Sequence, residues 1–246
     1  SVRAHQRGLE LLCQVDPLIQ DHVIGDPIRV QQVLMNLVGN AIKFTEKGEV
    51  LLRVTGTNTR SSSQVCHFEV IDTGIGIDPA KLDAIFQAFE QGDTSVTRRF
   101  GGTGLGLSIS SRLVSLMGGK LQVESSLGVG SRFYFSLPLR TCPKPSHDRL
   151  NKRAAQLAGR RVLIVEDNHS AQKVLTEAVS SWNMKPEIAG TAGTAMERLR
   201  KHDLPVDLIL LDYKLPDFNG LSLMRRLTEE QHVLPPTIML SSADAD

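Results

Sequence analysis

The chain has 246 residues, of which 41% are hydrophobic and 22% charged, and its formal net charge is +1. These values are typical of a soluble globular protein with room for one large domain or two ordinary ones. No apolar run approaches the roughly 18 to 20 residues that span a bilayer, and the N-terminus does not resemble a signal peptide. The three cysteines, Cys13, Cys66 and Cys142, are scattered without a C-x-x-C pair. This arrangement argues against a disulfide framework or a zinc site and favours a reducing cytosol.

The charges are unevenly spread along the chain. Residues 1–140 carry 14 Lys or Arg against 13 Asp or Glu, residues 141–161 carry 6 against 1, and residues 162–246 carry 8 against 13. The middle stretch is polar and contains two prolines, as interdomain linkers do. We therefore expect a domain at 1–140, a linker at 141–159 and a second domain at 160–246. A nucleic-acid-binding patch is the alternative for the linker charges, but the stretch lacks interleaved aromatic residues, so no nucleic-acid partner is expected.

The first predicted elements are a short edge strand at 9–15 and a long helix. Asp26 has the character of an N-cap and Pro27 that of a first helical residue. Apolar residues then recur at helical spacing as far as Phe44. The pattern predicts an amphipathic helix with one apolar face toward a core.

Three polar residues of this helix, Asn36, Asn40 and Lys43, lie at positions i, i+4 and i+7 and so share one stripe of its surface. Asparagine is a poor helix former. Two asparagines one turn apart therefore need an explanation, which is either a ligand-binding stripe or an ordinary polar face.

An acidic residue ends the next predicted hairpin. Two β-branched runs, 49–57 and 64–71, are joined by a polar loop, and the second leads into Asp72, followed by Gly74 and Gly76. Such a carboxylate can accept a hydrogen bond from an amine while the glycine backbone turns tightly around a ring. A β-turn that begins with Asp is the alternative.

A glycine-rich segment, Phe100 to Leu107, precedes an apolar run that is compatible with a helix to Met117. Glycines let backbone N–H groups close on a ligand, and a helix N-terminus favours an anion, so the segment suits a polyphosphate. A plain structural turn is the alternative. The segment is not a Walker A loop and lacks the dinucleotide-binding spacing.

Three further elements are predicted around this segment. They are a short helix begun at Asp78-Pro79 that carries Leu82, Ile85, Phe86 and Phe89, a polar mobile loop at 90–99, and a hairpin of 120–125 with 131–137.

These motifs, taken in order, resemble a known family. The series is Asn36-x-x-x-Asn40-x-x-Lys43-Phe44, Asp72-x-Gly74-x-Gly76, Phe86-x-x-Phe89 and Gly102-x-Gly104-x-Gly106. It resembles the N, G1, F and G2 boxes of the catalytic ATP-binding domain of sensor histidine kinases and covers residues 26–138. The resemblance implies the Bergerat fold, a two-layer α/β sandwich in which helices cover one face of a mixed sheet.

The resemblance also implies roles for single residues. Asp72 would accept from the adenine amino group, Asn40 would bind Mg²⁺ through its side-chain oxygen, and Lys43 would contact phosphate. The implied catalytic residues are Asn36, Asn40 and Lys43. The implied ATP-binding residues are Asn36, Asn40, Lys43, Asp72, Gly74, Gly76, Ile77, Phe89, Arg98, Gly102, Thr103, Gly104, Leu105 and Gly106.

The residue type at position 36 distinguishes two enzyme classes that share this nucleotide-binding fold. Related ATPases place a Glu at this position to activate water, and asparagine has no useful basicity. Hydrolysis should therefore be slow, which leaves the γ-phosphoryl group for an imidazole nucleophile. We expect a phosphotransferase to histidine.

The acceptor histidine is missing from the chain, because no His lies in an H-E-L-R-T-P-like setting. We therefore expect a fragment of a longer kinase whose partner is a histidine-bearing dimerisation domain. The parent would be a homodimer that signals to a histidine phosphotransfer protein or a response regulator. A cytoplasmic location is expected, with membrane attachment of the parent left open.

Residues from 161 onward alternate between strand and helix patterns. Buried strands are predicted at 161–165, 206–211 and 237–240, and the first two end in Glu166-Asp167 and Asp212. The alternation implies a doubly wound parallel sheet, whose ligands bind at the carboxyl ends of the strands. The other predicted elements are helices at 171–181, 191–202 and 221–227 and a short strand near 186–189.

This second pattern resembles response-regulator receiver domains of the flavodoxin-like type. By resemblance, Asp212 is the phosphoacceptor, Glu166, Asp167 and Asp212 bind Mg²⁺, and Ser241 contacts the phosphoryl group. The last strand, the last helix and the Lys of the family pattern are absent from the printed sequence. We therefore expect an incomplete and less stable second domain.

Together these observations predict an ATP- and Mg²⁺-dependent protein-histidine kinase of a two-component phosphorelay, with onward transfer to Asp212. Two alternatives stay open. One is a nucleotide-binding regulatory module without turnover. The other is an independent ATPase of the same fold.

Overall fold

The computed structural model describes residues 9–17, 19, 22–58, 63–82, 84–87, 105–142, 156–200, 205–230 and 234–240. The chain separates into two compact units, Ser1–Lys144 and Pro145–Asp246, and each is described by itself. None of the described helices is long and apolar enough to cross a lipid bilayer.

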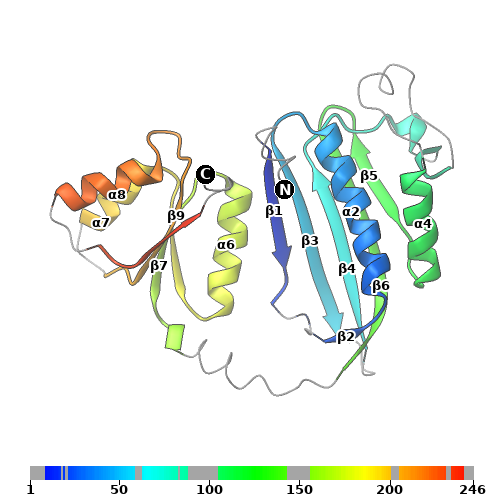
Figure 1. The fold of residues 1–246 in the computed structure, drawn as a ribbon, viewed down its shortest axis with the longest axis horizontal. Helices are drawn as coiled ribbons and strands as arrows, with labels where there is room; N and C mark the ends of the chain where they lie inside the picture. The colour runs from blue at the N-terminus through cyan, green and yellow to red at the C-terminus, as the bar shows by residue number, and fades with distance from the viewer. Residues whose placement is uncertain are drawn as a thin grey trace. The chain divides into compact units, whose positions relative to one another are not determined.

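The first unit contains a mixed six-stranded sheet (Figure 1). Five strands follow the order β1-β3-β4-β6-β2, and β5 pairs with β6 on the same side as β2. β1 runs parallel to β3, while the other pairs are antiparallel. The bounds are β1 Glu10–Val15, β2 Val23–Ile24, β3 Glu49–Asn58, β4 Ser63–Asp72, β5 Gln122–Ser126 and β6 Gly130–Thr141.

Two helices, α2 (Pro27–Phe44) and α4 (Gly106–Leu116), lie side by side on one face of this sheet and run in opposite directions (Figure 1). α2 begins as predicted, because the Asp26 side chain accepts a hydrogen bond from the Arg29 N–H and Pro27 follows it. The layered arrangement matches the expected α/β sandwich.

The short helix predicted from Asp78 to Phe89 is wrong in type over the described residues. The structure has two separate 3₁₀ turns, η1 (Pro79–Lys81) and η2 (Ala84–Phe86). Asp78 does cap the first of them through the Ala80 N–H. Segments this short gain too few i→i+4 hydrogen bonds to offset helix nucleation, so 3₁₀ geometry is the usual result.

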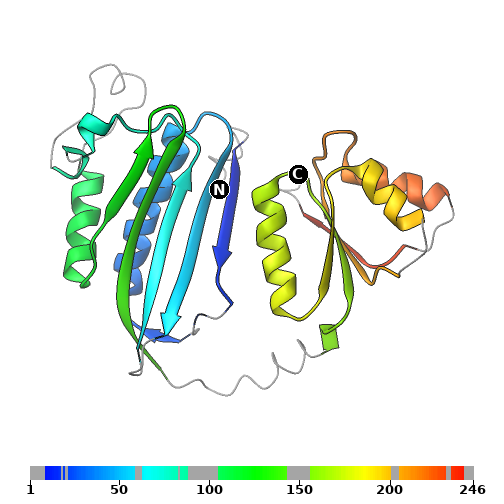
Figure 2. The ribbon, with the colours of Figure 1, turned by 180° about the vertical axis from the view of Figure 1, so that it is seen from behind.

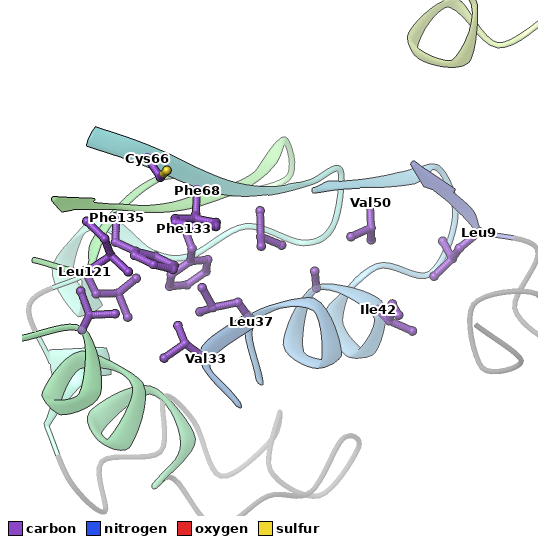
Figure 3. Close-up of a cluster of buried hydrophobic side chains, with 14 residues drawn as sticks. Leu9, Val33, Leu37, Ile42, Val50, Cys66, Phe68, Leu121, Phe133 and Phe135 are labelled. Atoms are coloured by element: carbon purple, nitrogen blue, oxygen red, sulfur yellow. The ribbon is translucent and has the colours of Figure 1, made fainter. Parts of the chain in front are cut away.

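The core of the first unit lies between the sheet and the two helices (Figure 3). Phe68 and Phe135 stack with ring centroids 4.9 Å apart, and Val33 and Leu37 of α2 pack toward them from the helical layer. The alternating burial of β4 explains its sequence pattern, since every second residue points into this layer.

The opposite face of the sheet is polar. Glu69 of β4 pairs with Arg53 of β3 at 3.2 Å and with Arg132 of β6, and Arg132 also reaches Glu124 of β5 at 2.8 Å. These cross-strand pairs fix the register of four strands on a face that no described helix covers.

The second unit is a four-stranded parallel sheet in the order β10-β9-β7-β8. Helix α6 covers one face, and α7 and α8 cover the other (Figure 2). Successive residues of β7 point to opposite faces, so all four residues from Val162 to Val165 are fully buried. The bounds are β7 Arg161–Val165, α6 His169–Ser181, β8 Lys185–Ala189, α7 Ala192–Arg200, β9 Leu208–Asp212, α8 Gly220–Glu229 and β10 Thr237–Leu240.

Candidate functional site

Asp72 ends β4 beneath the C-terminus of α2. Its side chain is only 7% exposed, and its Oδ1 accepts a hydrogen bond from the Gly74 N–H at 2.9 Å. Burial raises the pKa of this carboxyl, although the backbone N–H groups of Gly74 and Ser131 act in the opposite direction. A buried acceptor at a strand end is suited to a ligand that offers a hydrogen-bond donor.

The loop after Asp72 passes between two neighbouring segments. On one side the Ile75 N–H donates to the Phe44 carbonyl at the end of α2 (3.2 Å), and on the other the Gly128 N–H donates to the Ile75 carbonyl (2.7 Å). Gly74 fits because a Cβ there would lie 2.5 Å from the Phe44 oxygen. The loop therefore needs its glycines for space.

Gly76 needs both space and backbone freedom. Its φ is +67°, and a Cβ would lie 2.0 Å from the Ser126 carbonyl oxygen. The next residue, Ile77, donates its N–H to Ser125 Oγ at 2.8 Å, and this hydroxyl in turn donates to the Gly130 carbonyl. The β5–β6 turn thus holds the outer half of the loop.

Asn40 and Lys43 lie near the end of α2, on the stripe predicted from the sequence. Asn40 is half-buried, and its side chain makes no hydrogen bond to any described residue. Lys43 Nζ lies over the Phe44 ring, 4.8 Å from its centroid, and burial lowers the pKa of its ammonium group. Asn40 therefore has an amide without a hydrogen bond among the described residues, and Lys43 has a partly desolvated charge, in the last turns of the helix whose end meets the Asp72 loop.

Asn36, the third residue of this stripe, contacts α4. Its Nδ2 donates to Ser110 Oγ at 2.9 Å, and a Cβ at Gly106 would lie 2.4 Å from its Oδ1. Ser110 is 2% exposed. The Asn36 carboxamide is thus enclosed between the two helices.

α4 begins without a side-chain cap from any described residue. Its N-cap position is Leu105, and the Ser108 hydroxyl donates back to the Leu105 carbonyl. Uncapped N–H groups at a helix start form a site for an anion. The predicted residues Phe89, Arg98, Gly102, Thr103 and Gly104 lie outside the described residues, as does the predicted mobile loop at 90–99.

The second unit brings three carboxylates together at the carboxyl edge of its sheet. Glu166 and Asp167 follow β7, Asp212 ends β9, and one oxygen of each lies within 4.8 Å of the others. Glu166 is 8% exposed, and one of its carboxylate oxygens accepts from the Asn168 N–H at 3.1 Å. Three carboxylates this close repel one another, which a divalent cation with a preference for oxygen ligands relieves. The donor set fits Mg²⁺.

The pKa of the Asp212 carboxyl is raised, chiefly by burial, with a smaller contribution from the charge of Asp167. The backbone N–H groups of Lys214 and Tyr213 oppose this shift. Behind Asp212 the loop folds back tightly, since a Cβ at Gly220 would lie 2.5 Å from the Asp212 carbonyl oxygen. Ser241, predicted to contact a phosphoryl group, lies outside the described residues.

Sequence reasoning missed several residues that support these sites. Ser110 holds Asn36, and Ser125 holds the Asp72 loop. Asp217 accepts hydrogen bonds from the Ala192 and Gly193 N–H groups at the start of α7. The α7 sequence has Thr191 as its local cap, so nothing in its pattern indicates a second cap from 25 residues further along the chain.

Two family profiles match this chain, one in each unit. Residues 25–141 match the histidine kinase-, DNA gyrase B- and HSP90-like ATPase family, and residues 162–246 match the response regulator receiver domain. The chain therefore joins a histidine kinase-like ATPase domain to a receiver domain. The fold class predicted for each unit is confirmed.

The relatives of this domain pair are sensor kinases. Sensor protein TorS of Escherichia coli is 41% identical over 230 residues, which cover 94% of this chain and 24% of the relative. The autoinducer 2 sensor kinase/phosphatase LuxQ of Vibrio vulnificus is 37% identical, covering 89% of this chain and 26% of the relative. The crystal structure of full-length ShkA in complex with AMPPNP has a TM-score of 0.70 and 29% identity, covering 98% of this chain and 50% of that one. The chain thus spans about a quarter of these curated relatives.

Proposed function

We propose that this chain is the catalytic and receiver portion of a hybrid sensor histidine kinase. The ATPase domain transfers the γ-phosphoryl group of ATP to a histidine outside this chain, and Asp212 then takes the group from that histidine. The observation that carries the proposal is the combination of a nucleotide-type site and a receiver carboxylate cluster in one chain. The match to Sensor protein TorS runs through both domains.

In this proposal Asp72 selects adenine by accepting a hydrogen bond from its amino group. The buried, hydrogen-bonded carboxylate is held in place before the ligand arrives, and Gly74 and Gly76 let the loop that follows it pack against Phe44 and Ser126. The side chain of Ile77 packs against the core of the first unit and so anchors the end of the same loop.

Asn40 offers its side-chain oxygen to Mg²⁺, and Lys43 contacts phosphate. When bound, Mg²⁺ neutralises charge on the phosphate oxygens. The Asn40 amide makes no hydrogen bond within the described ranges, which supports this role. In this proposal the backbone N–H groups from Gly102 to Leu105 cradle the phosphates, Arg98 reaches phosphate, and Phe89 and Gly106 are also among the ATP-binding residues. These roles rest on the resemblance of the sequence motifs.

The chain needs no strong general base for transfer to histidine. The lone pair of an imidazole nitrogen forms the N–P bond as the bond between the γ-phosphorus and the bridging oxygen of ADP breaks, and ADP leaves with the electron pair. Asn36 cannot activate water as a carboxylate would. Slow hydrolysis and preserved transfer are therefore expected together.

The second transfer ends on Asp212. A carboxylate oxygen of Asp212 attacks the phosphorus of the phosphohistidine, the N–P bond breaks, and the imidazole is released. Glu166, Asp167 and Asp212 hold Mg²⁺ in this proposal, and Ser241 contacts the phosphoryl group. The parent acts as a homodimer whose catalytic and receiver portion lies in the cytoplasm and passes phosphoryl groups to a phosphotransfer protein or a response regulator.

The test is transfer of radiolabel from [γ-³²P]ATP. The chain is mixed with a separately supplied dimerisation domain that bears the acceptor histidine. We expect the label to appear first as acid-labile phosphohistidine on the dimerisation domain. It should then appear on Asp212 of the chain. Asp212→Ala should keep the first labelling and abolish the second, and Asn40→Asp should abolish both.

Other outcomes favour the other candidates. Tight ATP binding without any label transfer would overturn the kinase proposal and leave a regulatory module. Phosphate release from ATP that is equally fast with and without the acceptor domain would instead identify an independent ATPase.

A further inference from the structure

We propose that Asn36 is a positioning residue, whose carboxamide seats the first turn of α4 against α2 and so sets the spacing between the α4 backbone and Asn40. The inference rests on the proposed function, because it concerns how that nucleotide site is held in shape. It assigns Asn36 a different role from that of a direct ligand of phosphate or metal.

The first observation is a partly buried hydrogen bond between residues 74 positions apart. Asn36 Nδ2 donates to Ser110 Oγ at 2.9 Å, and Ser110 is 2% exposed. A hydroxyl this buried is destabilising when it loses its partner. The neighbouring Ser108 shows the contrast, since its hydroxyl bonds within its own helix, to the Leu105 carbonyl. Ser110 is thus directed across the interface to α2.

The second observation is that Gly106 provides space at this contact. A Cβ on Gly106 would lie 2.4 Å from Oδ1, 3.1 Å from Cγ and 3.2 Å from Nδ2 of Asn36. Gly106 is not one of the residues with positive φ, so the backbone does not require glycine there. Glycine is also a poor helix residue. Its place in the first turn of α4 is explained by the close approach of the Asn36 amide.

These two observations place the whole Asn36 carboxamide against α4, with one hydrogen bond and one close steric approach. Nδ2 bonds to Ser110, and Oδ1 lies against Gly106. Asn40, one turn further along the same stripe, has no hydrogen bond to a described residue. The geometry divides the two asparagines, with Asn40 available to a ligand and Asn36 committed to helix packing.

The division matters because α4 begins at this contact without a side-chain cap from the described part of the chain. Its uncapped N–H groups and the Asn40 amide serve the same phosphates only if the two helices keep their spacing. Displacements of about 1 Å at such a site reduce function strongly. Asn36 is suited to prevent that displacement, since its amide lies against Gly106 in the first turn of α4 and donates to Ser110 at the start of the second turn.

The decisive experiment is a rescue in the full chain. Affinity for Mg²⁺·ADP is measured by isothermal titration calorimetry for Gly106→Ala, Asn36→Ala and the double variant. Gly106→Ala should weaken binding by about tenfold or more, because its methyl group displaces α4. The double variant should bind more tightly than Gly106→Ala alone, since the obstructing amide is gone. If Asn36 were instead a direct ligand, the two losses would multiply and the double variant would be the weakest binder.

Ser110→Ala provides a second measurement that does not depend on the rescue. It removes the hydrogen bond and leaves every proposed ligand in place. We expect the affinity for Mg²⁺·ADP to fall by about threefold to tenfold, while affinity for adenosine, which has no phosphates, stays at the wild-type value. A loss of adenosine affinity equal to that of Mg²⁺·ADP, or no loss of Mg²⁺·ADP affinity, would overturn the proposal.

The control is Gly39→Ala, on the same helix as Asn36, where an added Cβ would meet nothing within 4 Å. Its affinity should equal that of the wild type. Circular dichroism melting gives the unfolding midpoint of each variant, and the titrations are made below that temperature. This separates lost folding from lost positioning. Failure of the wild-type chain to bind ADP would count against the proposed function itself. Binding by the wild type without any rescue would count against Asn36 alone.

Discussion

The carboxylate of Asp217 lies across the start of α7, where its Oδ2 accepts a hydrogen bond from the Gly193 N–H at 2.8 Å and its Oδ1 one from the Ala192 N–H at 3.1 Å. Oδ1 also accepts from the N–H of Phe218. Asp217 belongs to the loop that follows Asp212, so one side chain caps a helix and ties down the loop beside the carboxylate cluster. Loss of this cap has consequences that can be measured.

Asp217→Ala should lower the free energy of unfolding of the receiver domain by about 1 kcal/mol, the usual effect of losing a helix N-cap. Trp182, the single tryptophan of the chain, lies at the C-cap of α6 and reports on this domain alone. Urea unfolding followed by its fluorescence is the measurement. Glu197→Ala, which removes an equal charge from an exposed position of α7, is the control and should change little. Equal effects of the two variants would contradict the capping role.

The contribution of Asp217 should also depend on pH. Burial is the largest single influence and raises its pKa, but the N–H groups of Gly193, Ala192 and Phe218 together outweigh it, so the pKa is lowered. A lowered folded-state pKa gives stability that is present above the unfolded pKa of about 3.9 and is lost as the pH falls through the folded value. The difference between the wild type and Asp217→Asn should therefore shrink in acid. A difference that stays constant would show that charge plays no part.

Substitution of Gly76 should be much more damaging than substitution of Gly128. Both have positive φ, +67° and +78°, but a Cβ on Gly76 would lie 2.0 Å from the Ser126 carbonyl oxygen, whereas one on Gly128 would meet nothing within 4 Å. Gly128→Ala should cost about 1 to 2 kcal/mol from backbone strain alone. Gly76→Ala should cost more and abolish ADP binding. Calorimetric unfolding of both variants tests this, and similar melting temperatures would refute the steric argument.

Asp72→Asn should stabilise the unliganded ATPase domain at neutral pH. Burial raises the pKa of Asp72, and a raised folded-state pKa gives stability that is present at low pH and lost as the pH rises through the folded value. The neutral amide removes this loss while its oxygen can still accept from the Gly74 N–H. Circular dichroism melts near the unfolded pKa of about 3.9 and at a pH of about 8 should differ more for the wild type than for the variant.

The same variant should weaken ATP binding, because an amide presents a donor as well as an acceptor to the base. Preference for ATP over GTP should fall by about tenfold, the effect of one well-made hydrogen bond in a buried site. Competition titrations with the two nucleotides measure the ratio. An unchanged ratio would remove Asp72 from adenine recognition.

Magnesium should stabilise the receiver domain through the carboxylate cluster. At ten times its dissociation constant a bound ion adds about 1.4 kcal/mol, seen as a shift of the Trp182 unfolding curve that EDTA reverses. Asp212→Asn and Glu166→Gln should each reduce this shift. Asp217→Asn, which leaves the three ligands intact, should keep it. Equal shifts in all three variants would place the ion elsewhere.

Local patterns predicted those parts of the fold that depend on neighbouring residues. The start of α2 follows from Asp26 and Pro27, and the alternating runs of β3 and β4 give their hairpin. The three carboxylates were expected to converge because the carboxyl ends of neighbouring parallel strands meet at one edge.

Contacts between distant segments could not be found in this way. β2 has two residues, too few for a periodic signal, and exists because it pairs with the end of β6. The Asn36 stripe was visible on α2, but its partner Ser110 lies on a helix 74 positions away. The same limit hid Asp217, whose capping of α7 depends on the folding of the loop after β9.

β2 also determines how force enters the ATPase domain. Val23 and Ile24 pair with Thr141 and Arg140, and the Cys142 N–H donates to the His22 carbonyl at 2.9 Å. The chain leaves the domain at this point, so a pull from the linker loads β2 before it can peel β6 from the sheet. β2 is separated from the N-cap of α2 by Gly25 alone. A load on β2 is therefore passed directly to the N-terminus of the helix that carries Asn36 and Asn40.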